Sequence, residues 1–252
     1  MNVICHARGG ESPFHLTNGP RKSESHDVNA SKALKTVKVG EAPGKLSPLP
    51  RPFYEPSAKV VAPKLLGHLL IRNTPEGPCG GPIVEVEAYL TDDPACHAFN
   101  GPTARTRVMW GPPGHSYVYF IYGNHWCFNV VCLPPGKAEA VLIRAIEPAI
   151  GLEMMERRRK VVRQRDLTNG PGKLCAAMGI DRSFDGDDLC DANSPLLIAR
   201  NPSLKTFLRE RGPVVTTTRI GIVKAASLPL RFYLDGSDFV SRRERRGRLK
   251  AV

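Results

Sequence analysis

The sequence predicts a single mixed α+β domain, built on a mostly antiparallel, curved sheet with flanking helices. Residues 83–90 alternate between two kinds of side chain with the period of a β-strand. Two β-prone runs, 117–122 and 126–133, flank a Gly-Asn pair, which is typical of an antiparallel hairpin. Helical patterns follow at residues 148–165 and again from residue 169.

Length and composition exclude several classes of protein. The chain has 252 residues, of which 41% are apolar and 24% charged, as is ordinary for a globular domain with a real core. It has no apolar run long enough to span a membrane, and its N-terminus lacks the apolar stretch of a secretory signal. Seven cysteines without a C-x-x-C pair indicate a reducing compartment.

The charge is strongly basic, with 36 Lys and Arg against 24 Asp and Glu, a net charge of +12. Residues 1–49 carry seven basic and four acidic side chains and show no lasting hydrophobic period, so we expect a disordered basic tail. Residues 50–241 form the expected domain, and 242–252 a second basic tail. A basic chain favours polyanionic partners, but charge alone leaves a merely solvated surface equally open.

The first elements of the domain are a helix and a strand. The ordered chain is expected to begin near Arg51, and residues 62–70 predict a short helix that runs into a strand, with Pro63 in the first helical turn. The strand at 83–90 is expected to turn one face to the core (Val84, Val86, Ala88, Leu90) and to carry Ile83, Glu85, Glu87 and Tyr89 on the other.

A long polar loop and a hairpin come next. Residues 91–114 contain four prolines and an isolated His97, and a loop of this length within a domain is usually functional or disordered. In the hairpin, Tyr122 lies at the tip, where a large aromatic ring has no core to fill. For the hairpin's other aromatic residues, core packing is the more probable role at Tyr117, Phe120 and Phe128.

The second half of the chain adds strands and helices. Residues 140–146 predict a strand that carries Arg144 among apolar neighbours, and 148–165 a helix with a basic block at 157–160. A further helix begins at residues 169–175, with Pro171 in its first turn and Gly179 as its C-cap. Strands are expected at 216–223 and 230–234.

Three groups of residues could carry chemistry. Glu85 and Glu87 could supply a general base, although a pair of surface glutamates on an edge strand is the usual alternative. The rings of Tyr89, Tyr119, Tyr122 and Trp126 lie near strand ends or turns and could sandwich a flat base, or they could pack in the core. Arg144 needs a partner, either a structural carboxylate or a phosphate.

Two further patterns are weaker. Cys96, His97, His125, Cys127 and Cys132 are possible zinc ligands, but their spacing matches no known finger or ribbon. Residues 170–173, Gly-Pro-Gly-Lys at a helix start, could hold a phosphate, but such a segment is more often only a cap and a turn. Neither the P-loop nor the dinucleotide-binding glycine motif is present.

Several longer motifs occur in a fixed order between residues 51 and 241. They are RPFY at 51–54, IVEVEAY at 83–89, ACH at 95–97, GPPGHSYVYFIYG at 111–123, NGPGKLC at 169–175 and RFY at 231–233. In these motifs the chain strongly resembles the alkyladenine (3-methyladenine) DNA glycosylase family, also called the MPG type. The two tails are not covered by the resemblance.

The resemblance implies a role for each matching residue. Glu87 would activate water, Tyr89 and Tyr119 would wall the pocket of a flipped base, and His97 would contact the edge of that base. Tyr122 would fill the gap left by the extruded nucleotide. Asn129 would screen the purine 2-amino group, and Arg144 would contact a phosphate. The chain departs from the family at Asn124, where methionine is common, which puts affinity in doubt more than chemistry.

The resemblance therefore implies a monofunctional glycosylase of base excision repair, which flips alkylated or deaminated purines out of duplex DNA and hydrolyses the N-glycosidic bond. It implies no metal or organic cofactor, a monomer without membrane contact, and a place beside the DNA, cytoplasmic in a bacterial-type cell and nuclear in a eukaryote. It does not rank the lesions. A non-catalytic nucleic-acid binder and a metal-dependent hydrolase using His97, His125 and the cysteines remain as rivals.

Overall fold

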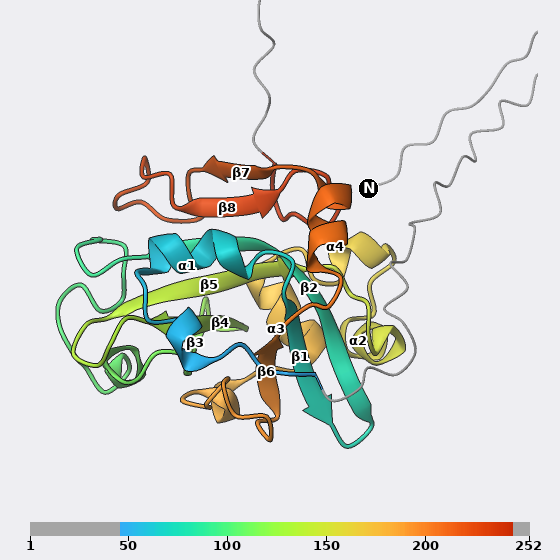
Figure 1. Cartoon of the computed structure of the whole chain (residues 1–252), viewed down its shortest axis with the longest axis horizontal. Helices are drawn as coiled ribbons and strands as arrows, with labels where there is room; N and C mark the ends of the chain where they lie inside the picture. The colour runs from blue at the N-terminus through green and yellow to red at the C-terminus, as the bar shows by residue number, and fades with distance from the viewer. Residues whose placement is uncertain (1–45, 244–252) are drawn as a thin grey trace, which may run out of the picture. The chain divides into compact units, whose positions relative to one another are not determined.

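A computed structural model describes residues 46–243. In this part of the chain, eight strands form one curled antiparallel sheet, in which β3, β4, β5, β2, β1 and β6 follow one another and β8 joins β2 to β7 (Figure 1). The strands are β1 Leu69–Thr74, β2 Gly77–Tyr89, β3 Ser116–Ile121, β4 His125–Cys132, β5 Glu139–Ile146, β6 Leu196–Ala199, β7 Val214–Thr217 and β8 Arg231–Leu234. The α-helices are α1 Ala58–Leu65, α2 Leu152–Arg159, α3 Pro171–Met178 and α4 Leu204–Arg211. The predicted fold class is confirmed.

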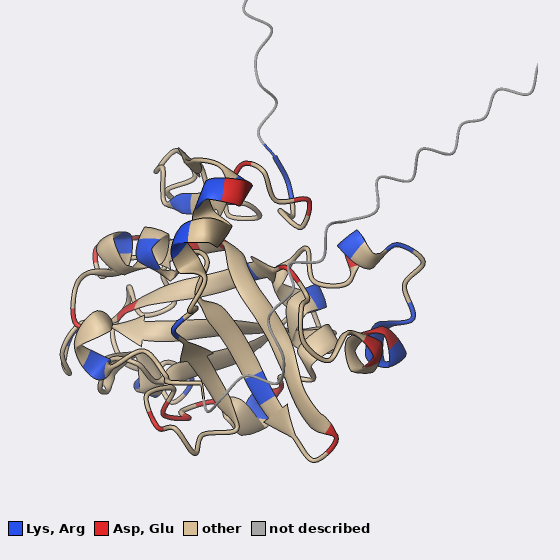
Figure 2. Cartoon of the chain, turned by 45° about the vertical axis from the view of Figure 1, so that its right-hand side comes forward, with Lys and Arg blue, Asp and Glu red and all other residues tan. Residues whose placement is uncertain are grey.

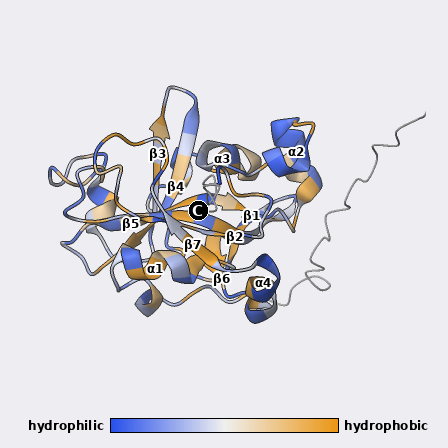
Figure 3. Ribbon diagram, turned by 90° about the horizontal axis from the view of Figure 1, so that it is seen from above, coloured by the Kyte–Doolittle hydropathy of each residue, from blue (hydrophilic) through white to orange (hydrophobic). Residues whose placement is uncertain are grey.

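The strands in the middle of the sheet alternate between two different surroundings. Their core-facing residues, among them Val86, Phe128 and Ile143, pack with buried residues of α1 and α3 into the main hydrophobic core. Figure 3 shows these strands carrying the most hydrophobic residues, while α2 and α4 are largely hydrophilic. The opposite face of the same strands is left to line a cavity.

Two β-bulges interrupt the pairing of β2 with β5. Glu85 pairs with Ala145 and Val86 with Ile143, so Arg144 is an extra residue on β5. The pairing of Ile83 with Ile146 then leaves Val84 as an extra residue on β2. The second bulge explains one difference from the predicted faces: Ile83 does not share the side of Glu85 but lies in the core beside Val84.

The β3–β4 hairpin turns through three residues, Tyr122 to Asn124, because Ile121 pairs with His125. Tyr122 has a φ of 55° and is 76% exposed, so the predicted position at the tip is confirmed. Tyr117 and Phe128 are buried as predicted, but Phe120 is 44% exposed, and core packing was the wrong prediction for it. It stands opposite Trp126 on the same face of the hairpin as the buried Val118, with their rings 4.8 Å apart.

The ends of several elements differ from the predictions. Pro63 lies in the last turn of α1 and not in the first; the carbonyl it leaves without a donor belongs to Lys59, which is exposed to water. Helix α2 is shorter than 148–165 because Gly151 and Lys160 on either side of it are left-handed, with φ of 65° and 49°. Strand β7 ends at Thr217, since the chain then leaves the sheet to cover the cavity.

The packed chain begins earlier than residue 50. Pro48 bridges to Ala199 beside β6, and Leu49 is buried with its N–H bonded to Ile198. Residues 1–45 of the expected N-terminal tail and residues 244–252 of the C-terminal one lie outside the described residues. No helix within residues 46–243 is long and apolar enough to cross a membrane.

Candidate active site

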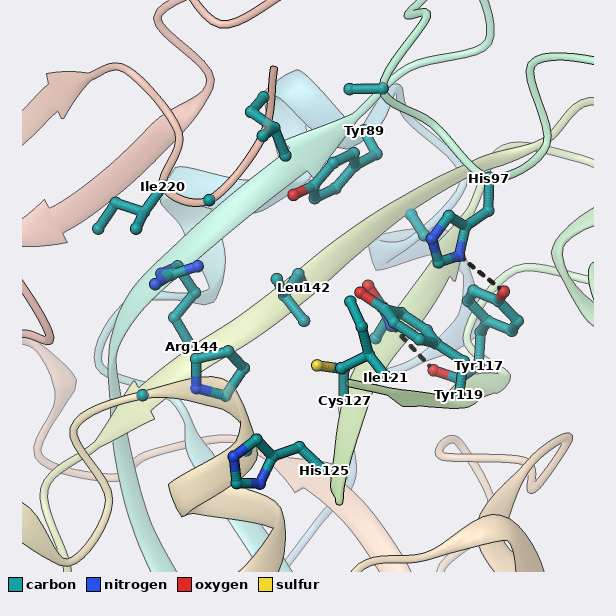
Figure 4. A pocket seen from close by; sticks show the side chains of 18 of the residues that line it. Tyr89, His97, Tyr117, Tyr119, Ile121, His125, Cys127, Leu142, Arg144 and Ile220 are labelled. Atoms are coloured by element: carbon teal, nitrogen blue, oxygen red, sulfur yellow. Dashed lines mark hydrogen bonds between the residues drawn. The ribbon is translucent and has the colours of Figure 1, made fainter. Parts of the chain in front are cut away.

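A cavity of about 480 Å³ lies on the face of the sheet opposite the main core. This volume falls within the range of about 300–1,000 Å³ that is typical of small-molecule sites. In Figure 4, Tyr89, Ile220 and Arg144 follow one side of the cavity, and His97, Tyr117 and Tyr119 follow the other, with Leu142 between them. The cavity therefore collects most of the residues that the sequence singled out.

Strand pairing places these side chains in rows. Tyr117 pairs with Asn129, Asn129 with Leu142, and Leu142 with Glu87, so one row crosses four neighbouring strands. Because residues paired across strands project to the same face, the row puts Glu87 on the face that bears the cavity. The alternation in the sequence was thus a sound guide to the face.

The Glu87 carboxylate is fully buried beneath residues that line the cavity. Its Oε1 accepts a hydrogen bond of 2.8 Å from the backbone N–H of Ile220 and forms an ion pair of 3.2 Å with Arg144. Its Oε2 accepts a bond of 2.9 Å from the hydroxyl of Tyr89. A carboxylate oxygen can accept two bonds, so Oε2 keeps room for a further donor such as water. The alternative, a pair of surface glutamates, is excluded because both side chains are buried.

Glu85 is also fully buried but does not line the cavity. Its Oε1 accepts bonds from Arg144 at 3.1 Å, Arg231 at 2.9 Å and the Ser241 hydroxyl at 2.8 Å. Its Oε2 accepts the Ser241 N–H at 2.7 Å. These partners tie β2 to β5, to β8 and to the segment after β8, so Glu85 serves the structure.

Arg144 lies between the two glutamates on the β5 bulge. Burial opposes its charge, yet Glu87 and Glu85 raise the pKa of its guanidinium above the ordinary value. Of the two predicted partners, the carboxylates are therefore present. Arg144 also borders the cavity, and its contact with a phosphate stays a prediction.

Aromatic rings form the walls. The Tyr119 ring meets the His97 ring edge-on at 4.4 Å, and the Tyr117 hydroxyl and His97 Nδ1 are hydrogen-bonded at 3.0 Å. Burial, together with the Glu87 charge, raises the pKa of Tyr89, and burial also raises the pKa of Tyr119. Burial raises the pKa of Tyr117 to about 12, so the three phenols stay neutral.

His97 stands on an exposed loop, but its ring is partly enclosed by Tyr117 and Tyr119. Burial and the nearby charge of Arg105 lower the pKa of His97 to about 4. The imidazole is therefore neutral at pH 7, with one nitrogen that donates and one that accepts. Such a group can read the edge of an uncharged or a cationic base.

The mouth of the cavity combines the hairpin tip with the start of α3. Tyr122 and His125 line it from the hairpin, and residues 170–173 line it from the helix. The Lys173 ammonium is held by Asn169 Oδ1 at 2.8 Å and lies 3.8 Å from Asp166. Figure 2 shows further basic residues on α2 and on the loop that leads from it toward α3. The exposed Asn124 follows Tyr122 at the tip.

Asn129 is buried within the cavity wall and donates from Nδ2 to the Tyr117 carbonyl at 3.0 Å. This bond fixes the orientation of its amide. All the predicted site residues except Glu87 line the cavity directly, and Glu87 lies behind three that do. The possible zinc ligands do not gather: within residues 46–243, no group of three or more His, Cys, Asp or Glu could hold a metal ion.

Sequence reasoning missed two residues that shape the site, Tyr117 and Ile220. Tyr117 was taken as core, although the period of two that it shares with Tyr119 could have placed it on the cavity face. Ile220 contributes through its backbone, which leaves no mark in a sequence. Lys173 lines the cavity with the rest of residues 170–173, which the sequence offered as a possible phosphate site, and phosphate binding there stays a prediction.

Comparison with known proteins agrees with this geometry. The sequence model of the methylpurine-DNA glycosylase (MPG) family matches residues 52–238. A protein of Methanoculleus marisnigri named "Putative 3-methyladenine DNA glycosylase" is 51% identical over 195 residues, which is 77% of this chain and 99% of the relative. Proteins of the same name from Rhodopseudomonas palustris and Koribacter versatilis are 50% and 45% identical, over 79% and 78% of this chain and 94% of each relative. The chain therefore belongs to the methylpurine-DNA glycosylase family of DNA glycosylases.

Proposed function

We propose that this protein removes alkylated or deaminated purines from duplex DNA as a monofunctional glycosylase, acting as a monomer in base excision repair. The observation that carries the proposal is the Glu87 carboxylate, buried and held by Tyr89, Arg144 and Ile220 at the wall of an aromatic cavity. It would act beside the DNA, in the cytoplasm of a bacterial-type cell or the nucleus of a eukaryotic one.

Substrate binding follows from the shape of the cavity. A base inside a duplex cannot reach a buried carboxylate, so the nucleotide must be flipped out. The extruded base lies between Tyr89 and Tyr119, with His97 at its edge. The exposed Tyr122 ring fills the vacated position in the stack. Alkylation at purine N3 or N7 makes the base cationic, and the faces of neutral tyrosine rings attract a cation.

The chemical step is hydrolysis of the N-glycosidic bond. Glu87 accepts a proton from water, the water oxygen forms a bond to C1′, and the bond from C1′ to the base nitrogen breaks. The base leaves with the electron pair, which neutralises an alkylated, cationic purine. Arg144 holds the carboxylate in place through Oε1, which leaves Oε2 to take the water. Lys173 is engaged with Asn169, and no amine takes part in this route.

The decisive experiment uses duplexes that each carry one defined lesion: 3-methyladenine, 7-methylguanine, hypoxanthine or ethenoadenine. The protein is incubated with each duplex, and abasic sites are scored as strand breaks after alkali. We expect breaks only after alkali and only with damaged purines. Binding without breaks would support a non-catalytic binder, breaks before alkali would overturn the monofunctional step, and loss of activity in EDTA would support a metal-dependent hydrolase.

A further inference from the structure

Arg219 lies in the loop after β7 with its side chain fully buried, and Asp93, in the loop after β2, is its partner. Arg219 Nη1 contacts Asp93 Oδ2, and Nη2 donates to Asp93 Oδ1 at 3.0 Å. Nη1 also donates to the Ala88 carbonyl on β2 at 3.0 Å. One guanidinium thus joins two loops to the strand that carries Glu87.

This guanidinium adjoins two of the groups that hold Glu87. The residue after Arg219 is Ile220, whose N–H donates to Glu87 Oε1. The Arg219 guanidinium carbon also lies 4.6 Å from the centre of the Tyr89 ring, and the hydroxyl of that ring donates to Glu87 Oε2. Arg219 therefore fixes one donor to each oxygen of the carboxylate without touching the carboxylate itself.

Asp93 extends the connection to the base pocket. Its Oδ1 accepts the N–H of Ala95 at 3.0 Å, and its carbonyl accepts the N–H of Cys96 at 2.8 Å. These bonds shape the turn that presents His97 to Tyr119. The Asp93 carboxylate that pairs with Arg219 therefore also holds the turn before His97, which lines the opposite side of the cavity.

Stability alone explains the pair poorly. A buried ion pair loses the hydration of both charges, and apolar residues of similar volume often stabilise a fold as well or better. Among the described residues, Arg219 Nε has no hydrogen-bond partner although it is buried. A buried N–H without a partner costs free energy, so the pair stabilises the fold less than a fully hydrogen-bonded one would.

We propose that Arg219 and Asp93 are positioning residues that hold the Ile220 N–H and the Tyr89 hydroxyl on Glu87 and so set the geometry of the water-activating carboxylate. The inference rests on the proposed glycosylase function. Arg219 acts through Glu87, so its effect disappears when Glu87 can no longer act as a base.

The test compares Arg219→Lys with Asp93→Asn, which retains an acceptor and the side-chain shape. Arg211→Lys is the matched control, because Arg211 also pairs with a carboxylate, Glu147, at 2.8 Å and lies 5.3 Å from an aromatic ring centre, that of Phe207, which does not bond Glu87. The substrate is the lesion duplex from which the wild type removes the base fastest. Excision is measured with enzyme in excess, and binding is measured in the Glu87→Gln background.

We expect Arg219→Lys to lower the single-turnover rate constant roughly ten- to a hundredfold, the scale of a small misplacement of a catalytic group. Asp93→Asn should act in the same direction and less strongly, while Arg211→Lys leaves the rate unchanged. Affinity for the lesion duplex should stay within about threefold, because neither Arg219 nor Asp93 lines the cavity and residues without shared contacts couple weakly. If Arg219→Lys does not fold, the single-turnover rate constant of Asp93→Asn alone tests the inference.

A double-mutant cycle separates positioning from support of the fold. Added to Glu87→Gln, Arg219→Lys should cause no further loss of the residual rate. Equal losses in both backgrounds, or a wild-type rate in both folded variants, would overturn the inference. The proposed function would still stand in that case, because its own tests are base removal by the wild type, strand breaks only after alkali, activity in EDTA and the loss of excision in Glu87→Gln.

Discussion

Glu85 and Glu87 lie on the same face of β2 and are equally buried, but their surroundings differ in kind. Glu85 is surrounded by two arginines and both hydrogen-bond donors of Ser241. Glu87 has one arginine, one backbone N–H and one phenol, and its partners border a cavity. Burial is therefore no guide to which carboxylate reacts.

The difference lies in access to the cavity. Oε2 of each glutamate accepts one bond and could accept a second. Two of the partners around Glu85, Arg231 and Ser241, do not line the cavity, whereas all three partners of Glu87 do. Glu87 retains capacity at Oε2, next to the space where a base would sit. The reactive carboxylate is thus the one whose free acceptor position adjoins the cavity.

The largest effect is expected for Glu87→Gln. The substitution keeps the size of the side chain but removes the base, so the excision rate should fall by a factor of about 10² or more. Binding of lesion duplex should persist, as measured by a mobility-shift titration beside the alkali assay. A variant that excises at the wild-type rate would show that Glu87 is the wrong residue.

Glu85→Gln should lower the stability of the fold more than it lowers excision. It leaves Arg231 and Arg144 without a charged partner at Glu85, and breaking a buried pair costs about 3–5 kcal/mol of folding free energy. Denaturant unfolding would measure this loss, and excision well below the melting temperature should fall less than in Glu87→Gln. A stable Glu85→Gln protein without activity would invert the comparison of the two glutamates.

Tyr122→Ala tests a residue that the fold does not need. The ring is 76% exposed, so the melting temperature should stay nearly unchanged, whereas truncating a buried aromatic costs about 3–5 kcal/mol. Because unstacking a paired base costs a few kcal/mol, excision from a paired lesion should fall more than from a mismatched or single-stranded one. Equal losses on all substrates would end the role of Tyr122 as a wedge.

Asn129→Ser should alter specificity more than rate. If the amide crowds the purine 2-amino group, a shorter side chain should raise excision of guanine-derived bases relative to adenine-derived ones by severalfold, on the scale of about 1 kcal/mol for a small change in a pocket. The ratio is read from paired single-lesion duplexes. An unchanged ratio would remove Asn129 from contact with the base.

The smallest effect concerns pH and His97. Its pKa is about 4 in the folded protein against 6.5 for an ordinary histidine, so between these values the unfolded chain binds more protons at this position. The contribution of the neutral His97 imidazole to the free energy of unfolding is therefore complete above about pH 6.5, and it is lost as the pH falls toward 4. Melting temperatures at pH 7.5 and 5 should differ less in His97→Gln than in the wild type, and an equal difference would show that the folded imidazole titrates normally.

Much of this site follows from local rules. A period of two placed Glu85, Glu87 and Tyr89 on one face, and the hairpin pattern placed Tyr122 at an exposed tip. The sequence could not rank the two glutamates without the family resemblance, because their partners Ile220, Arg231 and Ser241 come from far along the chain. It also could not show the bulge that directs Arg144, since a bulge is a property of two paired strands and not of one.

Tertiary packing also overrode local preference at particular residues. Phe120 is β-prone and apolar, but its face of the hairpin extends beyond the helices that cover the core. The first half of β2, Gly77–Pro82, is rich in Gly and Pro and suggests a turn, yet it pairs with β1 through all six residues. Near Gly80 and Gly81, backbone carbonyls stand where a side chain would be, which is why glycine occurs there.

The late position of Ile220, Arg231 and Ser241 bears on the order in which the centre is assembled. During synthesis β2 and β5 leave the ribosome before the last part of the domain. Until that part follows, Ile220, Arg231 and Ser241 are absent, and of these four partners of the two carboxylates only Arg144 is present. Each glutamate must then remain hydrated. A nascent chain halted before residue 220 would hold the aromatic walls without the donors that bury the carboxylates, so competence for excision arrives only when synthesis of the domain is nearly complete.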